Sequence, residues 1–328
     1  MRFFSLLLLF AILFSCKDAS NKHNFDTENA EILDEGSTVK LEYKSRALLG
    51  EGAFWNHVTQ ELYWVDILGK SVNIYNPQNK SNRSFPLPFR VGTVVPQTDS
   101  TSVVALDNGI YILNTNNRLL TRLSNVEEDI PTNRFNDGKC DPNGNLWVGS
   151  MRLDETTAAA SLYKVAPDGT TSKMLGNITI SNGIVWTKDG KTMYYIDTPT
   201  GKIRAYDYDI ETSTITNDRT AVDVSPEDGY PDGMAIDEED MLWVGLWNGN
   251  AVAQFNPKNG ELIRKIEVPA HNVTACAFGG ADLDILFITT ARTDMTDEEI
   301  EKYPLAGSIF SVNPGVRGVN SKFFGTTD

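Results

Sequence analysis

Short apolar runs alternate with polar turns along nearly the whole chain after its first 36 residues. Valine, isoleucine and aromatic residues fill these runs, as at 61–66, 102–106 and 109–113, and glycine, asparagine, aspartate and proline fill the turns. Apolar runs bounded by turn residues are typical of β-strands. Residues 294–302 are the exception, where we expect a short helical turn. The pattern therefore predicts an all-β protein.

The strands repeat a common unit, in which a turn is followed by a strand with an aromatic residue near its centre. Residues 141–149 and 237–245 share the form Asp-x-x-x-x-Leu-Trp-Val-Gly. Residues 187–197 are a third copy, and 58–66 and 282–289 are two more divergent ones. A unit that recurs in this way indicates a repeat architecture.

One central strand residue per unit gives six markers, separated by roughly 40 to 50 residues, the period of a four-stranded propeller blade. The markers are Tyr63, Val103, Trp147, Tyr194, Trp243 and Phe287. We therefore predict a six-bladed β-propeller, whose radial packing buries both faces of each sheet. A β-sandwich or two small barrels is the alternative, although neither requires a recurring unit. An N-terminal strand within 38–43 is expected to close the last blade against 307–312.

The N-terminal segment has the character of an export signal. Arg2 precedes an apolar run that ends at Phe14, which is too short to span a bilayer and has the length of a signal-peptide core. The run leads into Cys16 in a pattern that resembles a bacterial lipobox. An ordinary secretory signal with an incidental cysteine is the alternative. We predict a lipoprotein signal peptide over residues 1–16, a flexible tether over 17–36 and the propeller domain over 37–328.

This organisation predicts an exported lipoprotein of the bacterial cell envelope, on its periplasmic or surface face. The only membrane contact expected is the lipid anchor, because no later apolar stretch is long enough to cross a bilayer.

Composition narrows the function further. The 328 residues are 41% hydrophobic and 22% charged, which allows a substantial core. The net charge of -15 argues against a nucleic-acid partner, which requires basic side chains to neutralise phosphates. The sequence has no Gly-x-Ser-x-Gly elbow and no His pair with metal-ligand spacing, so serine-hydrolase chemistry and a zinc-histidine site are poorly supported.

Four short polar motifs upstream of the repeated turns carry the candidate chemistry. They are Gly50-Glu51-Gly52, Arg134-Phe135-Asn136-Asp137-Gly138, Ser181-Asn182-Gly183 and Pro231-Asp232-Gly233. The innermost strand of a blade starts near the propeller axis, so equivalent residues of different blades converge there. Glu51, Asn182 and Asp232 would then offer two carboxylates and one amide oxygen, a set suited to Ca²⁺ or Mg²⁺. The alternative is that these are ordinary Asn-Gly and Asp-Gly turns.

The motifs and their order resemble the regucalcin and gluconolactonase family, the senescence-marker-protein-like lactonases. The resemblance runs from about Leu49 to Gly325. It includes the four motifs, Trp186, Tyr194-Tyr195-Ile196-Asp197, Asn248-Gly249, Phe278-Gly279-Gly280, Thr290-Ala291-Arg292 and Gly307-Ser308-Ile309-Phe310. It implies a six-bladed propeller with one axial divalent cation held by Glu51, Asn182 and Asp232.

The same resemblance implies substrate contacts at Arg134 and Asn136. A further acidic contact is expected after Gly149-Ser150-Met151, at Asp154, with Glu155 as the alternative.

The sequence thus predicts a metal-dependent hydrolase that opens a sugar lactone to its aldonic acid, with Asp232 as general base and metal ligand. Ca²⁺ is the first expectation for the cation, and Zn²⁺, Mn²⁺ and Mg²⁺ remain open. Three alternatives remain: an esterase or organophosphate hydrolase with the same metal, a non-catalytic lipid-anchored propeller that binds sugars or partners, and a metal with a structural role only.

Overall fold

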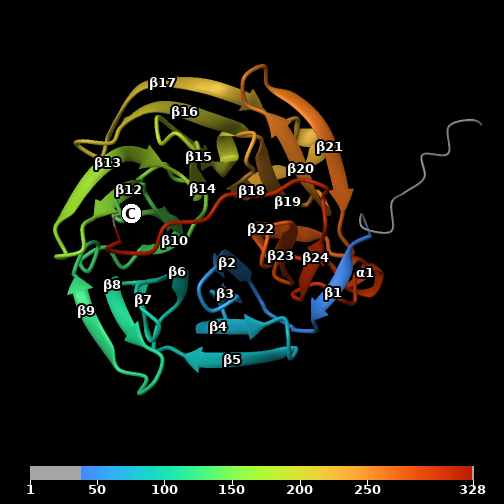
Figure 1. Ribbon diagram of the computed structural model, residues 1–328, viewed down its shortest axis with the longest axis horizontal. Helices are drawn as coiled ribbons and strands as arrows, with labels where there is room; N and C mark the ends of the chain where they lie inside the picture. Colours follow the sequence, from blue (N-terminus) through green and yellow to red (C-terminus); the bar gives the residue numbers. More distant parts are fainter. Residues whose placement is uncertain (1–37, 327–328) are drawn as a thin grey trace, which may run out of the picture. The chain divides into compact units, whose positions relative to one another are not determined.

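The computed structural model describes residues 38–326, which form six four-stranded antiparallel sheets around a central axis (Figure 1). Five blades run from the axis outwards in chain order. Their strands are β2 (Gly50–Asn56), β3 (Glu61–Asp66), β4 (Ser71–Asn76) and β5 (Ser81–Pro86) in blade one; β6 (Val91–Pro96), β7 (Thr101–Leu106), β8 (Gly109–Asn114) and β9 (Leu120–Ser124) in blade two; β10 (Asn133–Cys140), β11 (Leu146–Arg152), β12 (Ala160–Val165) and β13 (Thr171–Ile178) in blade three; β14 (Ser181–Trp186), β15 (Thr192–Asp197), β16 (Lys202–Asp209) and β17 (Thr214–Asp223) in blade four; and β18 (Tyr230–Ile236), β19 (Leu242–Trp247), β20 (Ala251–Asn256) and β21 (Glu261–Glu267) in blade five.

The sixth blade is built from both ends of the described chain. It consists of β22 (Asn272–Gly279), β23 (Ile285–Ala291), β24 (Ile309–Val312) and β1 (Lys40–Tyr43). Within residues 38–326 the helical elements are two 3₁₀ turns, η2 (Thr198–Thr200) and η3 (Pro226–Asp228), and one α-helix, α1 (Asp297–Lys302), which confirms the helical turn predicted within 294–302.

The predicted six-bladed propeller is confirmed, and the sandwich and two-barrel alternatives are wrong. Each marker residue lies on the second strand of its blade. The blades bury both sheet faces against their neighbours, as a radial arrangement requires, and Trp64, Trp147 and Trp243 are among the largest fully buried side chains.

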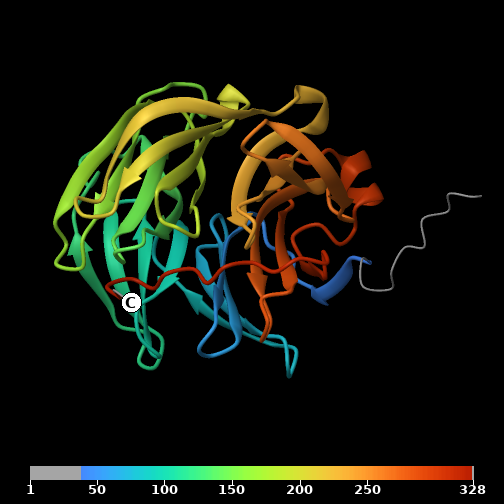
Figure 2. The ribbon, with the colours of Figure 1, turned by 45° about the horizontal axis from the view of Figure 1, so that its top comes forward.

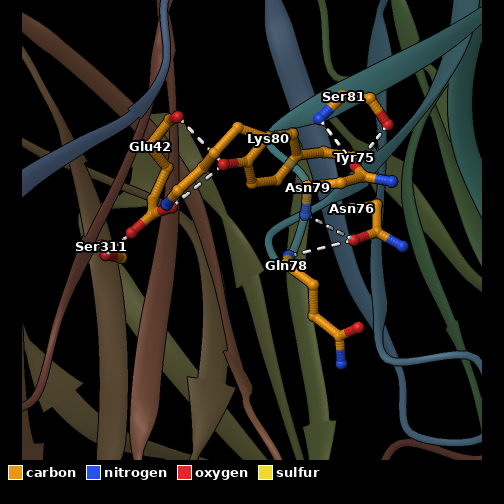
Figure 3. A network of polar contacts seen from close by, with 8 residues as sticks. All are labelled: Glu42, Tyr75, Asn76, Gln78, Asn79, Lys80, Ser81 and Ser311. Carbon is orange, nitrogen blue, oxygen red and sulfur yellow. Dashed lines mark hydrogen bonds and ion pairs between the residues drawn. The ribbon is translucent and has the colours of Figure 1, made fainter.

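Strand β1 closes the ring, as predicted, by antiparallel pairing with β24, with Lys40 opposite Ser311. Glu42 on β1 then ties blade six to blade one (Figure 3). Its carboxylate accepts a hydrogen bond of 2.7 Å from the Ser311 hydroxyl and one of 3.1 Å from the Tyr75 hydroxyl of blade one. Lys80, also of blade one, forms an ion pair with the same carboxylate. Polar side-chain contacts therefore reinforce the strand pairing that closes the ring.

The repeated Asp-x-x-x-x-Leu-Trp unit is held by the same internal contacts in two blades. The indole nitrogen of Trp243 donates to Asp237 Oδ2 at 2.8 Å, and that of Trp147 donates to Asp141 Oδ2 at 2.8 Å. The other carboxylate oxygen of each aspartate accepts backbone N–H groups of the turn that follows it. The aspartate at the first position of the unit and the tryptophan at the seventh therefore hold the turn against the core of the blade.

The C-terminal tail, residues 314–326, runs across the face where the inner strands end (Figures 1 and 2, red). Gly318 pairs with Asp237 next to β18, and Lys322 pairs with Cys140 at the end of β10. Phe324 is buried, and its N–H donates to the Pro96 carbonyl of blade two. The tail thus links blades that are distant in sequence.

The predicted signal peptide (1–16), with its lipidation site at Cys16, and the whole of the predicted tether (17–36) lie outside the described residues. Within residues 38–326, no helix is long and apolar enough to cross a membrane.

Candidate metal-binding hydrolase site

A cavity of about 560 Å³ opens where the six inner strands begin. Its floor is polar and comes from the inner strands, with Glu51 of β2, Arg134 and Asn136 of β10, Asn182 of β14 and Asp232 of β18. Its wall comes from residues beside or beyond the ends of second strands, including Leu68, Leu153, Asp154, Glu155, Thr198, Trp247 and Asp294. The structure thus brings together at one cavity every site residue that the sequence predicted.

The predicted motifs lie inside strands, so the alternative that they are simple hairpin turns is wrong. The pairing between first and second strands breaks register in all six blades, after Glu51, Asn182 and Pro231 in the three motifs with predicted ligands. Such bulges twist a strand locally and redirect its side chains. Glu51, Asn182 and Asp232 are each 4% exposed and line the cavity at the axis.

The glycines that follow Asn182 and Asp232 have a steric function. A Cβ atom at Gly183 would lie 2.8 Å from the Asp232 carbonyl oxygen, and one at Gly233 would lie 2.6 Å from the Ala275 Cβ. Neighbouring inner strands therefore approach so closely that only glycine fits. This requirement explains the Asn-Gly and Asp-Gly dipeptides without any hairpin turn.

Glu51 and Asp232 form a buried carboxyl pair contributed by blades one and five. Burial raises the pKa of both groups, and the negative charge of the neighbouring carboxyl raises the pKa of Asp232 further. Asp137, buried beside them, also has a raised pKa because of burial and acts on both in the same direction. Burial and mutual repulsion thus disfavour the ionised form of these carboxyl groups at the axis.

A directed chain of hydrogen bonds crosses the floor from blade three to blade five. Arg134 Nη1 donates to Asn136 Oδ1 at 2.6 Å, and Asn136 Nδ2 donates to Asn182 Oδ1 at 2.9 Å. Asn182 Nδ2 donates to Thr198 Oγ1 at 2.7 Å, and that hydroxyl donates to the Pro231 carbonyl at 2.8 Å. Both ends of the Asn136 amide are used within this chain, so Asn136 holds its neighbours in position.

Asp154 and Glu155 both line the cavity, but their surroundings differ. The Asp154 carboxylate accepts from Arg152 Nε at 2.8 Å and from the backbone N–H groups of Thr156 and Thr157 at 3.1 and 3.0 Å. These bonds lower the pKa of Asp154. Glu155 has φ of 58° and acts electrostatically on Arg134, whose pKa burial lowers to about 10. Asp154 therefore organises its own loop, and Glu155 is the carboxylate that affects Arg134.

Three residues near the floor were given no role by the sequence alone. Asp137 lies in a predicted motif, but its burial was not foreseen. Thr198 directly follows β15, the second strand of blade four. It therefore lies at the same end of the blade as the predicted ligands. Arg90 precedes β6, and its Nε donates to both oxygens of Asp107 at 3.0 and 3.1 Å. The positional signal that points to Thr198 is its place immediately after a second strand.

The donor set fits a divalent cation. Asp232 Oδ1 is buried and has no hydrogen-bond partner, and two carboxylates face each other where burial disfavours their charge. A cation would satisfy that oxygen and offset both charges. Among the described residues no group of three or more His, Cys, Asp or Glu is arranged to hold a metal ion, so the Asn182 amide oxygen would be the third ligand.

Residues 49–292 match the model of the SMP-30/Gluconolactonase/LRE-like region. The chain belongs to this family. A Bacillus subtilis protein, YvrE, whose name assigns it provisionally to the sugar lactone lactonases, is 39% identical over 271 residues, or 83% of this chain and 93% of that protein. Human regucalcin is 33% identical over 292 residues, or 86% of this chain and 97% of its own length.

Solved structures of the family share the fold. A calcium-binding regucalcin from Agrobacterium tumefaciens superposes with a TM-score of 0.84 at 29% identity, covering 88% of this chain and 97% of that chain. The predicted family is thus confirmed, and with it the six-bladed architecture.

Proposed function

We propose that this protein is a divalent-metal-dependent hydrolase that opens a sugar lactone to its aldonic acid. The observation that carries the proposal is the unpartnered Asp232 Oδ1, buried with Glu51 and Asn182 at the floor of a cavity that also presents Arg134. Family membership and the names of the relatives support a lactone as the substrate class. Ca²⁺ is the proposed cation because the ligands are oxygen atoms and a relative is described as calcium-binding.

Hydrolysis of a lactone adds water across the ring ester bond. When bound, a divalent cation would polarise the carbonyl, lower the pKa of an adjacent water and hold Asp232 ionised. Asp232 takes one proton from the attacking water, whose oxygen bonds to the carbonyl carbon. The ring carbon–oxygen bond then breaks, and the ring oxygen receives that proton and becomes a hydroxyl group. The product is the open hydroxy acid.

The remaining residues bind and orient the substrate. Arg134 is buried and fixed by its bond to Asn136, so its guanidinium presents donors to sugar oxygens at little entropic cost. Asn136 donates to the amide oxygen of Asn182 and so holds that side chain in place. Asp154 or Glu155 accepts a hydrogen bond from a sugar hydroxyl at the wall of the cavity.

The test is metal-restored hydrolysis. Purified protein is stripped with chelator, and acid release from glucono-δ-lactone and a panel of other lactones is followed with Ca²⁺, Zn²⁺, Mn²⁺ or Mg²⁺ added singly. We expect one or more ions to restore turnover in the wild type and in the Asp282→Ala control, which alters an exposed carboxylate. Asp232→Ala should abolish turnover, and Arg134→Ala should mainly raise KM.

Normal turnover by Asp232→Ala would refute the role of Asp232. If the protein binds a cation but hydrolyses no lactone, the same panel extended to aryl esters and organophosphates would identify a related hydrolase. Inactivity on all of them would favour a propeller that binds sugars or partners.

We further propose that the first 16 residues direct export and that Cys16 carries the lipid anchor. The test is fractionation of a bacterial host that expresses the full chain or Cys16→Ser. The proposal expects the full chain in the membrane fraction and the variant released from it. Equal distribution of the two would overturn lipidation at Cys16.

A further inference from the structure

The proposed metal site depends on which of two orientations the side-chain amide of Asn182 adopts. Its oxygen can serve as a ligand only if it points to the axis, whereas the same side chain rotated by half a turn would present a nitrogen that repels a cation. Some contact must therefore select one orientation over the other.

The hydrogen-bond chain across the floor selects it from both ends. At the blade-three end, Arg134 can only donate, so Asn136 must present Oδ1 to it and Nδ2 to Asn182. Asn136 Nδ2 also donates to the Ser181 carbonyl at 2.7 Å, which is an acceptor only. Asn182 must therefore receive that bond with its oxygen.

At the blade-five end, the Pro231 carbonyl can only accept, so the single Thr198 hydroxyl proton is used there. The hydroxyl oxygen must then accept its second bond, and only Asn182 Nδ2 can supply one. Both ends of the chain thus demand the same amide orientation. The Asn182 oxygen keeps one lone pair for Asn136 and one for a ligand.

Thr198 also links two blades. It belongs to the 3₁₀ turn η2 of blade four, and the carbonyl to which it donates belongs to the residue before Asp232 in β18 of blade five. The same hydroxyl therefore fixes the side chain of one predicted metal ligand and the backbone next to another. No other residue in the described part of the chain makes both contacts.

We propose that Thr198 is a positioning residue that orients the Asn182 amide and holds it in register with Asp232 for cation binding. This inference rests on the proposed function for the identity of the ligands, but it concerns cation affinity and does not depend on which substrate is hydrolysed.

Thr200, in the same turn, provides a matched control. Its hydroxyl donates to the Asp197 carbonyl at 2.6 Å and accepts from the Lys202 N–H at 3.2 Å, but it has no bond to Asn182. Thr198→Val and Thr200→Val each remove one hydroxyl with two hydrogen bonds from η2. A difference in Ca²⁺ affinity between the two variants therefore reports on the hydrogen bonds to Asn182 and Pro231, and not on the stability of the turn.

The experiment is calorimetric titration of chelator-stripped wild type, Thr198→Val, Thr198→Ser and Thr200→Val with Ca²⁺, or with Zn²⁺, Mn²⁺ or Mg²⁺ if the wild type binds no Ca²⁺. Loss of a group that orients a metal ligand typically weakens metal affinity about 10- to 100-fold. We expect that loss for Thr198→Val and affinities within about threefold of the wild type for Thr198→Ser and Thr200→Val. Excess Ca²⁺ should restore to Thr198→Val any hydrolysis that it loses at low Ca²⁺. Thr198→Ala serves the same purpose if Thr198→Val does not fold.

Equal Ca²⁺ affinity in Thr198→Val and Thr200→Val would overturn the proposal, as would a wild type that binds none of Ca²⁺, Zn²⁺, Mn²⁺ and Mg²⁺. If Thr198→Val loses cation affinity while the wild type hydrolyses no lactone, the positioning role stands and the proposed lactonase activity fails.

Discussion

Glu51 and Asp232 lie together at the floor of one cavity on the propeller axis, although 181 positions separate them in the chain. Each group is buried, and burial together with neighbouring carboxyls raises the pKa of both. A cation at the floor of the cavity would therefore favour the ionised form of both carboxyls. The free energy of unfolding should rise when the cation binds.

Chelator-stripped wild type should gain stability when Ca²⁺ is added, by about 2.7 kcal/mol when free Ca²⁺ is 100 times its Kd. Asp232→Asn should abolish this gain. It should also be more stable than the stripped wild type, because a neutral amide replaces a carboxyl whose ionisation is disfavoured by burial and by Glu51. Thermal unfolding with and without Ca²⁺ measures both effects. An equal Ca²⁺-induced rise in Tm in wild type and variant would contradict a cation at Asp232.

Glu42 should contribute a pH-dependent share of the closure energy. Burial alone would raise the pKa of Glu42, but hydrogen bonds from Lys80, Ser311 and Tyr75 outweigh it and lower the pKa below 4.5. A carboxylate with a lowered pKa stabilises the fold above its unfolded pKa, and this stability is lost as pH falls through the folded pKa. Glu42→Gln should therefore cost about 1.5 to 3 kcal/mol at pH 7 and progressively less below about pH 4.5.

Denaturant titrations at pH 7 and at acidic pH test this expectation. Glu267→Gln, which alters an exposed glutamate on β21, is the control and should change stability little at either pH. A cost of Glu42→Gln that stays constant as pH falls would show that packing, not the charge, matters at the seam between the last and first blades.

The aspartate of the repeated unit should be among the most sensitive polar residues. Asp237 accepts from Trp243 Nε1, from Gln254 Nε2 at 3.1 Å and from two backbone N–H groups, and it is fully buried. Asp237→Ala leaves these donors unsatisfied, so we expect a loss of about 3 kcal/mol or more in the free energy of unfolding. Denaturant unfolding beside Asp282→Ala measures it. A loss under about 0.5 kcal/mol would mean that water replaces the carboxylate.

The two adjacent acidic residues at the wall of the cavity should separate in their kinetic effects. Glu155→Gln should raise KM about 10- to 100-fold if its carboxylate accepts a substrate hydroxyl, without a change in Tm. Asp154→Asn should lower Tm, because its carboxylate binds Thr156 and Thr157 within the loop. Steady-state kinetics and melting curves on both variants decide the assignment. The reverse pattern would identify Asp154 as the substrate contact.

Much of the fold could be predicted because it is written in local repeats. The six marker residues of the repeated turn-strand unit predict the number of blades, and the place of residues 38–43 in the chain predicts the closing strand. The polar motifs also predicted which side chains meet, since equivalent inner strands start near one axis.

The rest depends on contacts that no local pattern records. Thr198 meets Asn182 and Pro231 only because η2 of blade four packs beside β18 of blade five. The glycines after Asn182 and Asp232 are typical of turns, whereas their function is to let inner strands approach one another. The burial of Asp137 likewise follows from the packing of several blades. These relationships are set by three-dimensional proximity across blade boundaries.

The C-terminal tail affects the route by which substrate and product reach and leave the propeller axis. It lies over one end of the axis, and on the way to that end Lys139 reaches across from blade three to the Met234 carbonyl of blade five. If the tail and Lys139 close that end to solutes, a lactone that enters the candidate site would leave as its acid through the same opening. Incoming and outgoing molecules would then share one route, and accumulated acid should slow turnover by competition with the lactone.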